Sequence, residues 1–199
     1  MKRIASALVP AALVLTTLAL AVPPAAAEAP TKGFRAEFLM QQAGVEKELL
    51  SLAEATPAAK FSWRPAEGVR SVSEVYMHIA GGNYLFLGFA GVKSPDGISP
   101  AMEKDVTDKA AVIEAMKKSF AHLRAGVESI SDADLDKPVK VFGHETTVRG
   151  VLLIAASHEH EHLGQSIAYA RMNGIVPPWT AARMAKAAEK PAEKPAEKK

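Results

Sequence analysis

The chain has 199 residues, no cysteine and a formal net charge of +2 at pH 7. The lack of cysteine excludes structural disulfides, a cysteine nucleophile, a lipid-anchored lipoprotein and covalently attached haem. Lys2 and Arg3 account for the surplus charge, so the rest of the chain is neutral and a nucleic-acid partner is not expected.

Residues 1–27 have the pattern of a secretory signal peptide. Lys2 and Arg3 precede an apolar run over residues 4–22, and small residues follow up to Ala27. A membrane helix is the alternative, but Pro10 interrupts the run and no basic flank follows it. We therefore predict cleavage after Ala27, no stable membrane insertion afterwards, and a periplasmic or secreted protein.

Four segments have the periodicity of amphipathic helices, and they cover residues 34–55, 71–90, 108–130 and 147–173. The second begins with a capping box between Ser71 and Glu74, and the fourth ends before Gly174. Proline and glycine interrupt the long connections between helices 1 and 2 and between helices 2 and 3. The sequence thus predicts an all-α fold, a four-helix bundle with two long connections, over residues 28–179.

Two segments outside the helices have distinct compositions. Phe61 and Trp63 lie in the first long connection and are expected to cover one end of the bundle. Residues 180–199 degenerate into Glu-Lys-Pro-Ala repeats, which predict a disordered low-complexity tail.

The last helix carries histidines where a bundle core asks for apolar residues. Residues four apart on a helix lie about 40° apart around the axis, so His158 and His162 project from one face. They belong to a seam with steps of three and four: Val148, Val151, Ala155, His158, His162, Gln165, Tyr169 and Met172. A buried imidazole pair without partners is costly, and a shared metal ion would satisfy both rings. Hydrogen-bonded core histidines and a wet cleft without metal are the alternatives.

A third ligand is needed, and His78 is the only histidine near the buried face of another predicted helix. Three neutral imidazoles leave a coordination position open for water or substrate, as in catalytic zinc sites. Nickel and iron(II) also accept imidazole, so the predicted cofactor is a divalent metal ion, and these residues do not choose among zinc, nickel and iron. Gly81 and Gly82, one turn beyond His78, would let another helix or a ligand approach the backbone.

Two further residues of the last helix bear on this site. Glu161 lies about 60° from His158 on the helical wheel and is the candidate general base or hydrogen-bond partner. His160 lies about 200° from His158, so it is not expected to share the metal.

These residues carry a resemblance to a known family. The chain resembles the DinB family of four-helix-bundle proteins and the related YfiT-like metal-dependent hydrolases over residues 34–179. The matching residues are Trp63-Arg64-Pro65, Ser71, Glu74, His78, His158, His162, Gly164, Gln165, Tyr169, Arg171, Gly174 and Pro177-Pro178. The resemblance implies that His78, His158 and His162 bind a divalent metal, often zinc or nickel. It also implies thiol-transferase or isomerase activity in some relatives. The exported location and the extra imidazole of His160 depart from the family pattern.

Two classes of function are compatible with these features. The first is a metal-dependent hydrolase or a thiol or group transferase with a small-molecule substrate, and a homodimer is a compatible assembly. The second is a non-catalytic periplasmic metal-binding module or carrier. A walled pocket over the histidines would favour the enzyme, and a surface-exposed metal would favour the carrier. A di-iron site would need a second Glu-x-x-His motif and two more glutamates, which are not placed for it. Non-covalent haem between His78 and a last-helix histidine is a further alternative.

Overall fold

The computed structural model describes residues 29–189. The predicted signal peptide and the last ten residues of the predicted tail therefore lie outside the described residues. Within the described range, no helix is long and apolar enough to span a membrane.

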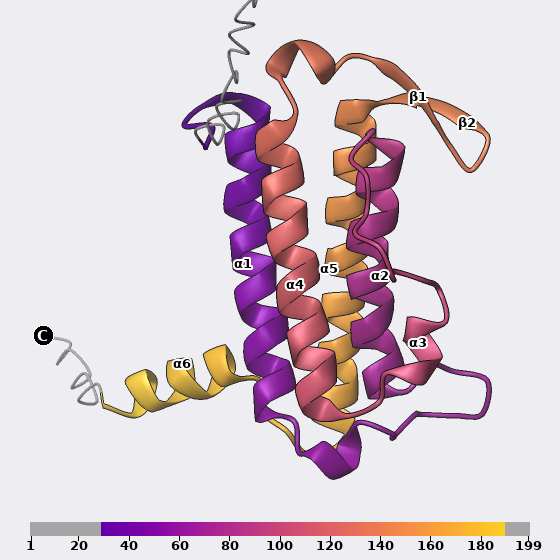
Figure 1. Cartoon of the computed structure of the whole chain (residues 1–199). Coiled ribbons are helices and arrows are strands. Elements are labelled where there is room, and N and C mark those ends of the chain that lie inside the picture. The colour runs from indigo at the N-terminus through magenta and orange to yellow at the C-terminus, as the bar shows by residue number, and fades with distance from the viewer. Residues whose placement is uncertain (1–28, 190–199) are drawn as a thin grey trace, which may run out of the picture.

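Four long helices form a bundle, which confirms the predicted all-α fold. They are α1 (Gly33–Ala55), α2 (Val72–Phe89), α4 (Lys109–Ser129) and α5 (Val148–Met172). Both α1 and α2 pack against α4 and α5. In Figure 1, α1 and α5 run in one direction, and α2 and α4 run in the other. The interface that matters for function is the antiparallel one between α2 and α5.

The two long connections contain short elements. The first holds a single 3-10 turn (Ala58–Lys60), and the second holds the one-turn helix α3 (Met102–Asp105), which packs against α2. Between α4 and α5, a second 3-10 turn (Asp132–Asp134) leads into a hairpin of β1 (Pro138–Val141) and β2 (His144–Thr147). The strands are antiparallel, with Val141 opposite His144. The sequence pattern did not predict this strand pairing.

The starts of the helices follow from side-chain caps. The predicted capping box is present: the Ser71 backbone N–H donates to Glu74 Oε2 over 2.7 Å, and the Glu74 N–H donates to Ser71 Oγ over 3.3 Å. The Asp108 carboxylate caps α4, and the Thr147 hydroxyl caps α5. Each cap satisfies an N–H group that has no partner within the helix.

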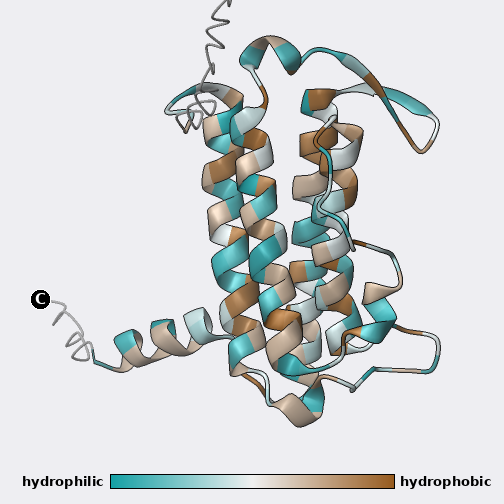
Figure 2. Ribbon diagram, in the orientation of Figure 1, coloured by the Kyte–Doolittle hydropathy of each residue, from teal (hydrophilic) through white to brown (hydrophobic). Residues whose placement is uncertain are grey.

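The core lies between the four helices. Figure 2 shows that each long helix alternates hydrophobic and hydrophilic residues, as one buried face requires. Phe61 is buried at one end of the bundle, and the Trp63 ring meets the Tyr169 ring edge to face at 5.3 Å. The prediction that these two aromatic residues cover the end of the bundle is therefore confirmed. Met172 is 64% exposed, so the buried seam of α5 ends before it.

The prediction of a disordered tail from residue 180 is wrong for residues 180–188. They belong to the helix α6 (Pro178–Ala188), which projects from the bundle in Figure 1. Pro178 occupies the first turn, where its missing N–H costs nothing, and the following run is rich in alanine and other strong helix formers. No residue of this helix is fully buried, although Trp179 packs partly buried against the core, so local propensity explains most of its formation.

Candidate metal centre

Three histidines from two helices converge in the middle of the bundle. The ring centroids of His78 and His158 lie 4.9 Å apart, those of His78 and His162 lie 4.7 Å apart, and those of His158 and His162 lie 4.6 Å apart. Each ring offers one nitrogen, and the three nitrogens lie within 4.8 Å of one another. The structure therefore brings together the three histidines that the sequence proposed as ligands, in a group that could hold a metal ion.

Two of the rings have their outer nitrogen held by a hydrogen bond. His78 Nδ1 lies 2.9 Å from Glu103 Oε2, and His162 Nδ1 lies 2.8 Å from Gln165 Oε1. Both partners are oxygen acceptors, so Nδ1 must carry the proton and Nε2 is left with its lone pair. Metal-bound histidines have this arrangement, because the outer hydrogen bond fixes the tautomer and the orientation of the ring. The donor set thus fits a metal ion.

Longer chains of hydrogen bonds hold these two partners in place. The Arg70 side chain donates to Glu103 Oε1 over 2.7 Å, and Gln165 donates to the Tyr169 hydroxyl over 3.0 Å. That hydroxyl donates in turn to the Arg70 carbonyl over 3.2 Å. Burial alone would raise the pKa of Glu103, but the hydrogen bonds from Arg70 and His78 outweigh burial and lower the pKa. Glu103 is therefore a carboxylate that accepts from both sides.

The third ring, His158, is placed by close packing. It lies against Gly82, where an added Cβ would come within 2.5 Å of His158 Cε1. Its Nδ1 is buried and has no hydrogen-bond partner among the described residues, which leaves this ring free to meet a cation. Gly81 is exposed, and nothing lies within 4 Å of a Cβ built there. The expected close approach is thus present at Gly82, and Gly81 has no part in it.

The electrostatics keep the rings of His78 and His158 neutral. Burial lowers the pKa of His158 to about 4, and the neighbouring His162, His78 and Arg70 add to this effect. Burial also lowers the pKa of His78, although the hydrogen bond to Glu103 opposes the shift. Neutral imidazole is the form that binds metal, so both rings are ready for ligation at neutral pH.

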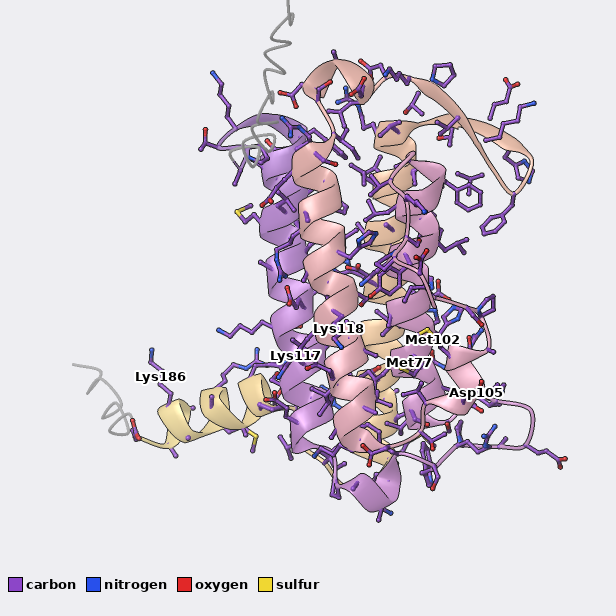
Figure 3. The ribbon with its side chains drawn as sticks, viewed as in Figure 1. Met77, Met102, Asp105, Lys117, Lys118 and Lys186 are labelled. Atoms are coloured by element: carbon purple, nitrogen blue, oxygen red, sulfur yellow. The ribbon has the colours of Figure 1, made fainter. Side chains whose placement is uncertain are left out.

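A pocket of about 600 Å³ lies over this group. His78 and His158 form part of its wall, and so do residues from α2, α3, the preceding connection and the hairpin tip. Met77 of α2 and Met102 of α3, both labelled in Figure 3, line the same space. A second, more polar pocket of about 450 Å³ is lined by Arg70, Lys104 and Gln165, and Glu103 borders both pockets. The histidines therefore stand at a walled pocket rather than on open surface.

The other candidate residues lie outside the group. His160 is exposed, and its Nδ1 lies 2.8 Å from the Ala156 carbonyl, as expected for the opposite face of α5. Glu161 is exposed too, and no hydrogen bond in the described part of the chain joins it to the three rings. Its proposed role as general base has no contact behind it, and Glu103 is the carboxylate at the site. Glu103 lies in a connection without periodicity, so no sequence signal pointed to it.

The fold and the convergent rings define the chain as a four-helix-bundle protein with a histidine group that could hold a metal ion. The family model described as the DinB superfamily matches residues 43–166, which is more than half of the chain. The chain belongs to the DinB superfamily, and the resemblance seen in the sequence is confirmed.

Individual relatives agree with this assignment. The chain is 28% identical over 127 residues to the uncharacterized protein YjoA of Bacillus subtilis, a match covering 62% of this chain and 80% of that protein. A DinB-like protein from Bacillus cereus superposes with a TM-score of 0.63 at 20% identity, covering 71% of this chain and 93% of the other. The YjoA crystal structure superposes with a TM-score of 0.57 at 24% identity, covering 70% and 93%. At these identities the two structures show a shared fold.

Proposed function

We propose that this chain is a metal-dependent enzyme that acts on a small molecule, with a divalent cation held by His78, His158 and His162. The observation that carries the proposal is the pair of outer hydrogen bonds, from His78 to Glu103 and from His162 to Gln165. These bonds set the tautomer that ligation requires and turn both Nε2 atoms toward a group whose three ligand nitrogens lie within 4.8 Å of one another, a convergence that hydrogen-bonded core histidines do not need.

Three imidazole ligands would leave at least one position open on zinc, nickel or iron. A metal bound there supplies a Lewis acid and can lower the pKa of bound water to about 7. The protein's own residues do the positioning: Glu103 keeps the proton on His78 Nδ1, and Gln165 keeps it on His162 Nδ1. Hydrolysis and group transfer, including transfer of a thiol, are the reaction classes that such a site supports.

A non-catalytic metal carrier is the alternative function. The pocket of about 600 Å³ over the rings favours the enzyme, because a carrier has no need of a walled space for a second molecule. Metal exchange without turnover of ester, amide or thiol-transfer substrates would instead favour the carrier. Export to the periplasm or beyond remains part of the proposal, and N-terminal sequencing of the exported protein should then begin at Glu28.

Metal analysis of the purified protein tests the proposal. We expect close to one metal ion per chain and a melting temperature that falls when a chelator is added. The linked stabilisation is about 2.7 kcal/mol when free metal is 100-fold above Kd. His162→Ala should lose both the metal and the chelator effect. His160→Ala is the matched control from the same helix and should keep both. Metal retained in His162→Ala, or lost in His160→Ala, would contradict the assignment.

A further inference from the structure

The pocket over the histidines has walls without positive charge. Leu85 and Phe86 of α2, Ile98 and Met102 beyond it, and Phe142 of the hairpin line it, and among the described residues no lysine or arginine does. Its one charged lining residue in this part of the chain, Glu103, is already bonded to His78 and Arg70. An anionic group lying along these walls, away from any metal held by the histidines, would lose its hydration and gain no cationic side chain.

Phe142 is an unusual residue on this wall. Its φ of +49° is the only positive value at a non-glycine among the described residues, and its ring is 68% exposed. A bulky residue in the left-handed region is strained by roughly 1–2 kcal/mol, and surface apolar area brings no compensation in the free protein. The ring meets Phe89 edge to face at 5.2 Å, so it is held over the pocket rather than turned away from the molecule. Phe142 and Gly143 form the two-residue turn of the hairpin, which requires positive φ at both positions, so the turn explains the backbone and leaves the exposed ring as apolar surface that a bound molecule can cover.

The ionisable groups that meet at the candidate metal site lie together in the pocket. His78 contacts Glu103 and lies beside His158, whereas Leu85, Phe86 and Phe142 present hydrocarbon and aromatic groups. The remaining polar lining residues are Tyr84, Ser94 and Ser99, and the Ser94 hydroxyl already donates to the Tyr84 carbonyl. The positive side chains of this region, Arg70 and Lys104, line the separate polar pocket beyond Glu103. A molecule that fits this division has an apolar body and one polar group at the histidine end.

We propose that the pocket binds an uncharged, largely apolar small molecule, whose body lies along Leu85, Phe86 and Phe142 and whose single polar group reaches His78 and His158. The volume of about 600 Å³ is within the range of small-molecule sites in proteins. This names the substrate class of the proposed enzyme and rests on the proposed function for the contact with a metal. The binding of the apolar body needs no metal.

Two fluorescent probes that differ by one sulfonate test the charge requirement. N-phenyl-1-naphthylamine is neutral, and 1-anilinonaphthalene-8-sulfonate is its anionic counterpart. With chelator present, so that no bound cation attracts the sulfonate, we expect the neutral probe to bind one per chain and the anionic probe to bind at least about tenfold more weakly, a difference of about 1.4 kcal/mol. Equal affinities, or tighter binding of the sulfonate, would overturn the proposal.

A pair of exposed leucines locates the binding site. Leu85 is 48% exposed and lines the pocket, whereas Leu153 is 53% exposed on α5 and does not. Leu85→Lys should weaken binding of the neutral probe about tenfold and reduce the ratio of its affinity to that of the sulfonate probe. Leu153→Lys should change the affinity by less than about twofold, as for an ordinary surface substitution. Equal losses in the two variants would place the probe on the outer surface and overturn the proposal.

The same titrations separate this proposal from the metal assignment. We expect the neutral probe to bind in the presence of a chelator, and the Leu85→Lys loss to persist there. If the protein purified without chelator holds no metal but binds the neutral probe, the proposed function is contradicted and the pocket proposal stands. Normal metal content in a protein that does not bind the neutral probe would contradict the pocket proposal and leave the proposed function standing.

Discussion

Helix α5 buries polar groups on two sides, and the two sides differ in what surrounds those groups. Toward α2 lie His158 and His162, whose rings meet that of His78; Nδ1 is hydrogen-bonded in His78 and His162, and in His158 it has no partner among the described residues. On its other side Glu159 is 1% exposed, and so is Gln42 of α1. Neither oxygen of Glu159 and neither amide atom of Gln42 has a hydrogen-bond partner among the described residues.

The difference shows that burial of a polar group does not by itself mark a functional site. Burial raises the pKa of Glu159 well above its usual value, and the nearby Glu46 raises it further, so this carboxyl resists ionisation. On the α2 side, in contrast, outer hydrogen bonds fix the rings of His78 and His162, and three histidine nitrogens converge in a group that could hold a metal ion. That side also has a buried carboxylate, Glu74, which is 6% exposed and has several partners. The arrangement of hydrogen-bond partners, rather than the degree of burial, therefore distinguishes a candidate binding site from buried polar groups that only lower the stability of the fold.

The largest effect is expected at Glu74. Burial acts to raise its pKa, but hydrogen bonds from the Ser71 backbone, Lys104 and Arg64 outweigh burial and lower the pKa to about 2. Because the folded-state pKa is depressed, this stabilisation is present above the unfolded value and is lost as pH falls from 4.5 to about 2. Glu74→Gln should lower the free energy of unfolding at pH 7 by at most about 3 kcal/mol. It should also make this free energy depend less on pH between 4.5 and about 2. Urea unfolding between pH 2 and 7 measures this.

The exposed Glu67 provides the control for this substitution. Glu67→Gln should leave the pH profile of unfolding as it is in the wild type. If Glu74→Gln and wild type lose stability equally between pH 4.5 and 2, the partners of Glu74 do not stabilise its charge.

The next effect concerns the glycine pair of α2. Gly82→Ala brings a Cβ within 2.5 Å of His158 Cε1, so the ring must shift. Overpacking of this kind costs about 1 to 3 kcal/mol, and the displaced ring should weaken metal binding. Gly81→Ala meets no atom within 4 Å and should stabilise the helix by up to about 1 kcal/mol. In thermal melts, the melting temperature should fall for Gly82→Ala and rise for Gly81→Ala. In metal titrations, the affinity should fall for Gly82→Ala only. Similar behaviour of the two would mean that His158 does not depend on Gly82 for its place.

The smallest effect is expected at Glu159. Its folded-state pKa is raised, so its contribution to stability is present below the unfolded value of 4.5 and is lost as pH rises through the folded value. Glu159→Gln removes this loss and should stabilise the protein at pH 7 by about 1 kcal/mol, the usual scale for a buried polar group without a partner. Unfolding would be followed from pH 4 to 8 with chelator in every sample, so that metal linkage does not contribute. Glu161→Gln, an exposed neighbour, is the control and should change nothing; a destabilised Glu159→Gln would show that the carboxyl has a partner after all.

The sequence predicted the helices because each long helix follows the 3.6-residue period and three of the four begin at a capping side chain. It also predicted His158 and His162, which interrupt an apolar seam, and His78, the one histidine near a second buried face. It missed Glu159, because the seam describes one face of α5 and this helix packs against both α1 and α2. His122 gave no such signal, and its Nε2 is buried while its ring lies 5.1 Å from that of Tyr84. Contacts made by irregular segments, such as Glu103 with His78, have no periodic signal to reveal them.

The origin of the pocket walls has an evolutionary consequence. The three histidines come from α2 and α5, whose positions are fixed by the bundle core. Much of the outer wall comes instead from residues 94–103 and from the hairpin tip at Phe142. Connecting segments tolerate insertion and substitution far better than packed helices do. A lineage with this fold can therefore exchange one accepted molecule for another by remodelling two surface segments, and Glu103 is the position in them where a change would also reach the histidine ligands.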